Sequence, residues 1–262
     1  MSNAFRDKIT NDLSQASKQK EDLTTVAELV ELSERLILTG DNDLIQEAVV
    51  QLRDRLRTNT EEIANALTAS PVAGMLVQIS QDINNLSLVA IAAEALSSVA
   101  ATSHDNAEAL IALGILPAMN ALMKLSSPAI LESAVWTLGN LAGDCNEVRD
   151  LVVRSGMIPD LIRILKTDTT KLSLRRCATW AMSNLARGRN PLPEVNEVLP
   201  TALQLLMSAD SDIRVDALWT VCFLSDGPAS ELLAFPQTVK RILEQIESEN
   251  LELVVPALRI VG

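Results

Sequence analysis

Residues 130–143 read ILESAVWTLGNLAG and residues 173–188 read SLRRCATWAMSNLARG, with the same arrangement of small residues, Trp and Asn. Two further segments have the same apolar spacing: 87–101 (SLVAIAAEALSSVAA) and 212–227 (DIRVDALWTVCFLSDG), of which the second keeps the Trp. Apolar residues recur in each at three- and four-residue spacings, which indicates an amphipathic helix. All three tryptophans of the chain, Trp136, Trp180 and Trp219, occupy one position of this helix, 44 and 39 residues apart. The repetition predicts an array of equivalent helices.

A second helix precedes this one in each unit. The segment ALGILPAMNALMKL (112–125) returns as RSGMIPDLIRILK (154–166), so that Gly114 and Gly156 lie 42 residues apart. A third copy without the Gly, NEVLPTALQLLM, follows at 196–207. Pro is tolerated in the first turn of a helix, where these segments carry it. A period of about 42 residues is typical of helical-repeat arrays. We therefore expect an all-α solenoid with two long helices in each unit.

Composition agrees with this fold class. The chain has 262 residues, of which 48% are hydrophobic but only 2% aromatic, and this composition suits closely packed helices better than a β sandwich. The formal net charge of −12 disfavours binding to nucleic acid and predicts a basic partner. No apolar run reaches the roughly 18–20 residues of a membrane span, so we expect no membrane association.

The chemistry-bearing residue types point away from catalysis. Cys145, Cys177 and Cys222 lack CxxC spacing, which predicts a reducing intracellular compartment and small buried side chains, with no disulfide and no metal site. The single histidine, His104, is expected to be a turn or helix-capping residue. The sequence contains no HExxH, GxSxG or Gly-rich phosphate loop. We expect a binding protein without a cofactor, not an enzyme.

Helical geometry separates the two faces of the helix around Trp136. At about 100° per residue, Trp136, Asn140 and Asp144 fall on one flank, away from the core. The expected core positions are Leu131, Ala134, Val135, Leu138 and Ala142. A buried Trp would leave the Asn one turn later near apolar surroundings, where an unpaired amide costs about 1–3 kcal/mol. We favour exposure on a shared groove, while the alternative is a scaffold whose Trp residues pack between repeats.

Stacked repeats present equivalent helices on one concave face, so these Trp and Asn residues would form a ladder. Trp rings can sandwich the aliphatic stems of Lys or Arg and attract their charge. An Asn side chain can bond both the N–H and the C=O of an extended peptide. The pattern predicts a groove for an extended basic peptide.

The runs ESAVWTLGNLAGDCNEVRDLVV, KLSLRRCATWAMSNLARGRNPLP, LWTVCFLSDGP and VVPALRIVG resemble the armadillo repeats of importin-α. The resemblance is strongest over residues 110–262 and weaker over 40–110. It implies a right-handed armadillo superhelix that carries proteins with basic nuclear localisation signals, in the cytoplasm and the nucleus.

The resemblance also implies a set of peptide-binding residues. They are Trp136, Asn140, Asp144, Trp180, Asn184, Arg187, Asp216 and Trp219. The Trp and Asn pairs would stack on the cargo peptide and tether it, and Asp144 would bind its key lysine. Asp216 and Trp219 would extend the major groove, and Arg187 would lie just beyond it.

Four positions depart from the family pattern. Glu94 and Ser98 stand where the family has the first Trp and Asn of its major site, and Thr102 and Ala107 replace the Gly and Thr that help hold the key lysine. The changes predict weaker affinity for ordinary basic signals. They leave open a second hypothesis, an armadillo scaffold that binds a dedicated protein partner.

The two ends complete the predicted organisation. Residues 1–38 are expected to form an N-terminal helical or flexible segment, in which FRDKITNDLSQASKQKED (5–22) resembles part of the importin-β-binding segment but lacks an arginine cluster. We therefore expect little or no binding of importin-β. Residues 39–262 are expected to hold about five repeats and a truncated sixth, because the chain stops at Gly262 within a repeat helix.

Overall fold

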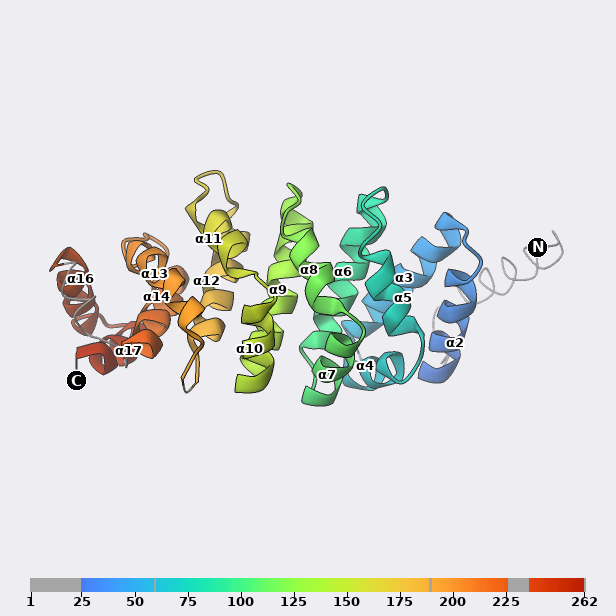
Figure 1. The fold of residues 1–262 in the computed structure, drawn as a ribbon, viewed down its shortest axis with the longest axis horizontal. Coiled ribbons are helices and arrows are strands. Elements are labelled where there is room, and N and C mark those ends of the chain that lie inside the picture. The colour runs from blue at the N-terminus through green and yellow to red at the C-terminus, as the bar shows by residue number, and fades with distance from the viewer. Residues whose placement is uncertain (1–24, 59, 189, 226–235, 262) are drawn as a thin grey trace.

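The computed structural model describes residues 25–58, 60–188, 190–225 and 236–261. Its helices are stacked along the long axis of the molecule, from the N-terminal to the C-terminal end (Figure 1). They are α2 (Val26–Ile37), α3 (Asn42–Leu56), α4 (Thr60–Thr68), α5 (Val72–Ile79), α6 (Leu86–Ala100), α7 (His104–Ala112), α8 (Ile115–Leu122), α9 (Pro128–Asp144), α10 (Asn146–Arg154), α11 (Ile158–Lys166), α12 (Leu172–Ala186), the 3-10 helix η1 (Pro193–Val198), α13 (Leu199–Leu205), α14 (Ser211–Leu224), α16 (Pro236–Ile246) and α17 (Leu251–Val261). Every regular element in these described ranges is helical, which confirms the all-α prediction.

Three helices, not two, make up the best-defined repeats, α7–α9 and α10–α12. Gly114 and Gly156 form the corners after the short first helices and have φ angles of +88° and +92°. Only Gly adopts such angles without strain, which explains why it recurs with the 42-residue period. The sequence pattern predicted two long helices in each unit and did not reveal the short first helices α7 and α10. In α7 only Asn106, Ala107 and Leu110 are buried, so its apolar pattern is weak.

The long helices α6, α9, α12, α14 and α17 lie side by side, each in contact with the next. Their inner faces belong to one cluster of buried side chains that runs from Leu29 to Ala257. The predicted core positions of α9 are all buried, and Val135 and Leu138 are completely so. Complete burial of one such side chain contributes roughly 1.5–3 kcal/mol, so the seam between long helices stabilises the array.

The cysteines are all free, but they do not share one environment. Cys177 and Cys222 are buried, as predicted, and burial raises the pKa of the Cys177 thiol to about 12. Cys145 is only half-buried, contrary to the prediction. It occupies the corner between α9 and α10, where it ends one helix and begins the other, so neither helix covers it completely.

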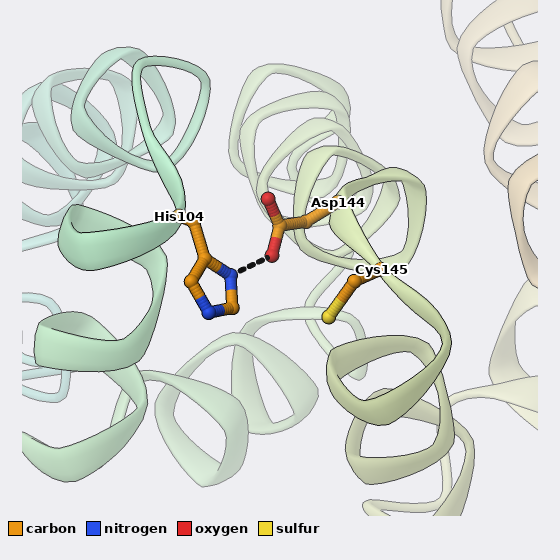
Figure 2. A group of neighbouring side chains, drawn as sticks. All are labelled: His104, Asp144 and Cys145. Atoms are coloured by element: carbon orange, nitrogen blue, oxygen red, sulfur yellow. Dashed lines mark hydrogen bonds and ion pairs between the residues drawn. The ribbon is translucent and has the colours of Figure 1, made fainter.

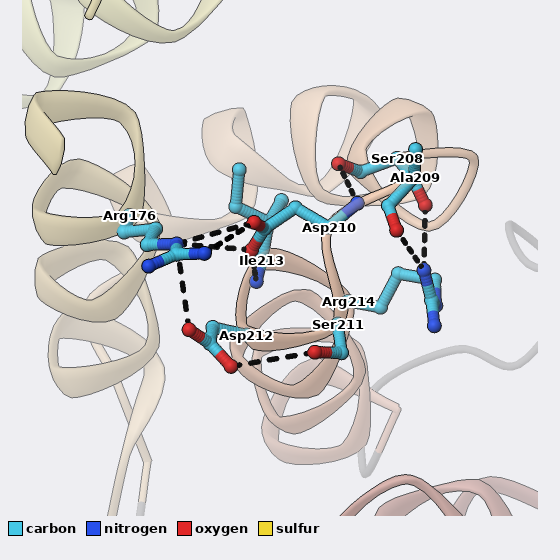
Figure 3. Close-up of polar contacts among 8 residues, drawn as sticks. All are labelled: Arg176, Ser208, Ala209, Asp210, Ser211, Asp212, Ile213 and Arg214. Carbon is cyan, nitrogen blue, oxygen red and sulfur yellow. Dashed lines mark hydrogen bonds and ion pairs between the residues drawn. The ribbon is translucent and has the colours of Figure 1, made fainter. Parts of the chain in front are cut away.

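Polar contacts also join neighbouring repeats at the ends of the long helices (Figure 3). On α12, Arg176 donates to Asp210, with 2.6 Å between Nη2 and Oδ2, and its Nε lies 3.4 Å from Asp212. Asp210 is the N-cap of α14 and accepts a hydrogen bond from the Ile213 amide. The guanidinium lowers the pKa of Asp210, chiefly through this hydrogen bond. The contact fixes the start of α14 relative to α12.

At the N-terminal end, a capping box of Thr25 and Glu28 begins α2, which packs on α3. The segment 5–22, with its predicted likeness to an importin-β-binding region, lies outside the described residues. Within the described part of the chain, none of the helices combines the length and the apolar character that crossing a bilayer requires.

Candidate binding groove

The three tryptophans lie on consecutive long helices, α9, α12 and α14, on the same face of the array. Trp136 is 47% exposed, which confirms that it points away from the core. Trp180 and Trp219 are half-buried. Successive repeats therefore present an aromatic ring on one surface, and Trp136 is the most exposed of the three rings.

Trp136 and Trp180 contact each other directly. Their ring centroids are 5.2 Å apart and the planes are inclined by 30°. A methylene chain between two rings needs about 3.5–4 Å on each side, so no side chain fits between them. The expectation that these two rings sandwich a Lys or Arg stem is wrong for this conformation. A ligand can instead lie along the outer surfaces of the stacked pair.

Two glycines on α9 allow α12 to approach this closely. A Cβ placed on Gly139 would lie 2.5 Å from Cζ3 of Trp180, and one on Gly143 would lie 3.0 Å from Nδ2 of Asn184. The motif around Trp136 therefore uses its small residues to seat the Trp and Asn of the next repeat.

The two asparagines of the pattern have different environments. Asn184 is 7% exposed and donates through Nδ2 to the carbonyl of Gly139 at 3.0 Å, so half of its amide is already used within the protein. Asn140 is half-buried, and its Nδ2 has no hydrogen-bond partner in the described part of the chain. A buried donor without a partner carries a desolvation penalty that a bound acceptor would relieve. Asn140 is therefore the residue of the pair that is ready for a ligand.

Asp144 ends α9 and lies beside the first residue of α7 (Figure 2). Oδ2 of Asp144 is 2.6 Å from Nδ1 of His104. The contact raises the pKa of His104, first through the hydrogen bond and then through the carboxylate charge. The expectation that His104 is a turn or capping residue is wrong: Ser103 caps α7, His104 is the first residue of that helix, and its side chain contacts Asp144, the predicted partner of the cargo lysine. The Cys145 Sγ lies nearby, all three donor atoms being within 4.8 Å of one another. The hydrogen bond accounts for this closeness, and we assign no ion to the cluster.

A hollow of about 270 Å³ lies beside Asn140 and Asp144. Its lining includes Thr102, Asn140, Asp144, Trp180, Asn184 and Arg187. Arg187 is exposed, and its backbone carbonyl accepts a hydrogen bond of 2.6 Å from the buried Arg149 of α10. The hydrogen bond from Arg149 thus holds the loop after α12 in place, and Arg187 in this loop lines the hollow.

A second hollow of about 500 Å³ lies on the other side of Trp180. Its lining includes Trp180, Arg187, Asp216, Trp219, Phe223 and Arg259. Burial, and then the nearby charge of Asp212, raises the pKa of Asp216 to about 6. Arg259 of α17 lies over the Trp219 ring, 5.5 Å from its centroid. We call the two hollows together the groove.

The structure thus brings all eight predicted peptide-binding residues to the lining of the groove except Trp136, whose ring stacks on the wall formed by Trp180. Their roles in peptide binding remain predictions. The sequence reading missed His104 and Arg259 as neighbours of Asp144 and Trp219. Each lies 40 residues from its partner, and this near-repeat spacing is the signal that could have found both.

Comparison with known proteins supports the same family. Residues 145–187 match the model for the armadillo/beta-catenin-like repeat, which spans the three-helix unit α10–α12. Importin subunit alpha-1b of Oryza sativa subsp. japonica is 33% identical over 229 residues, covering 85% of this chain and 42% of that protein. Importin subunit alpha-2 of Arabidopsis thaliana is 31% identical over 218 residues, covering 82% and 41%. The chain belongs to the importin-α family. It spans less than half the length of these two relatives.

The fold of this importin-α family member is also that of designed armadillo proteins. One designed armadillo repeat protein aligns with a TM-score of 0.80 and 19% identity, over 90% of this chain and 98% of its own. Another, solved in complex with the peptide (KR)4, aligns with a TM-score of 0.79 and 20% identity, over 91% and 98%. These likenesses confirm the armadillo solenoid.

The four positions that depart from the importin-α pattern lie around α6 and α7. Glu94 forms ion pairs with Arg57 and Arg53, so it is neither simply solvated nor free to receive a basic ligand. The hydroxyl of Ser98 donates to the backbone carbonyl of Glu94. Thr102 lines the first hollow and Ala107 is buried. The carboxylate of Glu94, at the position where the family has a Trp, is therefore already paired with arginines of the chain itself.

Proposed function

We propose that this chain is a protein-binding adaptor that holds basic peptides of the nuclear-localisation-signal type in the groove, for nuclear protein import. The observation that carries the proposal is the unpartnered Nδ2 of Asn140, one turn from the exposed Trp136 and one turn from Asp144. Together these three side chains offer an aromatic surface, a donor for a peptide carbonyl and a carboxylate for a cation. We propose that the protein acts in both the cytoplasm and the nucleus, as its family implies.

Charge and likeness both support a basic ligand. Asp144 and Asp216 line the two hollows, and the chain carries a formal net charge of −12, which attracts cationic segments. A designed protein of the same fold was solved with the peptide (KR)4. The relatives are named as importin subunits.

One observation favours a narrower partner range. The ion pairs of Glu94 with Arg57 and Arg53 occupy the N-terminal end of the surface, where the family pattern has a Trp. A scaffold with a dedicated partner would not need the groove at all. The two functions differ in whether partner binding depends on Asn140 and Trp136.

Fluorescence anisotropy of a labelled lysine-rich peptide, titrated with the whole chain, distinguishes them. We expect saturable binding that weakens at higher salt and is lost in Trp136→Ala and in Asn140→Ala. Leu151→Ala is the matched control, because Leu151 is an exposed apolar residue of α10 that does not line the groove.

Binding that survives both groove substitutions would contradict a peptide groove and favour the dedicated scaffold. Failure of the folded parent chain to bind the peptide would refute the adaptor function for this chain. A pull-down with purified importin-β tests the separate expectation of little or no binding.

A further inference from the structure

The carboxylate of Asp144 in the groove is in contact with another side chain of the protein, that of His104. His104 begins α7 and approaches Asp144 at the end of α9 in the same repeat, and Nδ1 of His104 lies 2.6 Å from Oδ2 of Asp144. Ser103 caps α7 by accepting a hydrogen bond from the Asn106 amide, which fixes the backbone just before His104. Figure 2 shows the imidazole and the carboxylate facing each other across the gap between the two helices. The proposed lysine partner therefore already has a partner in the chain.

The surroundings of His104 favour its charged form. Asp144 acts first, through its hydrogen bond and its charge, and Glu108 and Asp105 of α7 add smaller effects in the same direction. Glu108 lies 3.5 Å from the other ring nitrogen, Nε2. On the α10 side the nearest titratable group is the half-buried thiol of Cys145, whose pKa is raised by burial. The pKa of His104 is therefore above its ordinary 6.5, so part of the imidazole is charged near neutral pH.

We propose that His104 is an internal competitor for Asp144, which sets how tightly the groove holds a basic peptide and makes that affinity depend on pH. The inference rests on the proposed function, because it needs a peptide lysine at Asp144. A charged imidazole at hydrogen-bond distance neutralises the carboxylate and repels an incoming ammonium group. The side chain of His104 is half exposed, so it can leave the carboxylate without disrupting the core.

The direction of the effect follows from the charge of His104. Below the pKa of His104 the imidazolium occupies Asp144, and a peptide must displace it. As pH rises through that pKa, the competing charge disappears and the carboxylate becomes available. Peptide affinity should therefore increase with pH. Asp216 in the second hollow ionises with a pKa of about 6 and adds a rise of its own, so a pH series on the parent alone is not enough.

The decisive experiment compares the parent chain with His104→Gln at pH 6.0, 7.0 and 8.5, by anisotropy of the labelled lysine-rich peptide. Gln keeps a polar side chain but cannot carry a charge. We expect His104→Gln to bind about two- to fivefold more tightly than the parent at pH 6.0, the range of an exposed charge pair, and equally at pH 8.5. Both proteins keep the contribution of Asp216, so it cancels in the ratio.

A second readout does not depend on peptide affinity. His104 is the only histidine in the sequence, so its imidazole gives a single set of NMR signals without mutation of other residues. We expect the pKa of His104 to fall towards its ordinary value in Asp144→Asn. We also expect saturating peptide to lower the His104 pKa in the parent, since the lysine takes over the carboxylate.

Three results would overturn the inference. A His104 pKa that is the same in the parent and Asp144→Asn would remove the contact on which it stands. Equal peptide affinity of parent and His104→Gln at pH 6.0 would show that the contact does not compete, while the proposed function survived. No peptide binding by either protein, with the His104–Asp144 titration intact, would refute the proposed function and the inference with it.

Discussion

Gly139 of α9 lies directly against the indole ring of Trp180 on α12, so closely that a Cβ at this position would fall 2.5 Å from Cζ3 and 3.0 Å from the Ala181 Cβ. Atoms of real side chains do not approach to 2.5 Å, and the Trp180 ring also packs against Trp136, with 5.2 Å between the ring centroids. The absence of one methyl group thus decides how two repeats meet, and with it where the groove wall stands.

Gly139→Ala should therefore displace Trp180 and weaken the seam between α9 and α12. We expect a loss of about 1–3 kcal/mol in the free energy of unfolding, the range for an overpacked core. Urea denaturation followed by Trp fluorescence measures it. Gly74→Ala is the control, because a Cβ there meets a single side-chain atom, Cδ2 of Leu113, at 3.3 Å. Equal stability of both variants would contradict the close packing at Gly139.

The asparagines should separate binding from stability. Asn140→Ala removes a donor that has no partner in the described chain, so we expect peptide affinity to fall with little change in stability. Asn184→Ala removes the hydrogen bond to the Gly139 carbonyl, so we expect a loss of about 1 kcal/mol in unfolding free energy. Peptide titration of the two variants measures the change in affinity, and urea denaturation measures the change in stability. A loss of stability in Asn140→Ala as large as in Asn184→Ala would be inconsistent with an unpartnered amide.

Asp216 should make stability depend on pH. Its folded pKa of about 6 lies above the ordinary value of 3.8, so the folded state binds more protons between these limits. Stability contributed by this group is present below about pH 4 and is lost as pH rises through 6. Asp216→Asn removes the buried charge, and we expect it to be more stable than the parent by about 1 kcal/mol at pH 7.5, after allowance for partial exposure.

Urea denaturation of parent and Asp216→Asn at pH 5.0 and 7.5 tests this expectation. The difference between the two proteins should be larger at pH 7.5. Asp168→Asn, in the exposed loop after α11, is the control and should have a smaller effect. A parent that is stabilised relative to Asp216→Asn as pH rises would mean that a cation already compensates the carboxylate.

Arg149 should stabilise the loop that carries Arg187, which lines the groove. It is 1% exposed and donates to the Arg187 carbonyl at 2.6 Å, to Asn146 at 3.1 Å and to Asp150 at 2.9 Å. Arg149→Met keeps the bulk but leaves these acceptors without their donor, and we expect a loss of roughly 2–4 kcal/mol in unfolding free energy. Thermal and urea unfolding measure it, with the exposed Arg154→Met as control. A loss below about 0.5 kcal/mol, which is typical of ordinary surface substitutions, would contradict a structural role for the hydrogen bonds of Arg149.

The sequence by itself determined the repeat and the class of fold. Its 42-residue period and the recurring Trp and Asn predicted a helical array, because each repeat must bury the same apolar stripe against its neighbours. Helical geometry also placed Trp136 off the core, which its exposure of 47% confirms. These features are local or periodic, so they can be read along the chain.

Only the tertiary structure decided which groove positions are already occupied. His104 contacts Asp144, Arg57 contacts Glu94 and Arg259 lies over Trp219, in each case from 37 to 40 residues away in the chain. It also decided that Trp136 and Trp180 touch, and that Asn184 is used within the protein while Asn140 is not. The spacing of about one repeat makes such pairs neighbours, but whether two side chains meet depends on the separation of the helices. That separation is fixed by packing at residues such as Gly139, which no pattern along a single helix reveals.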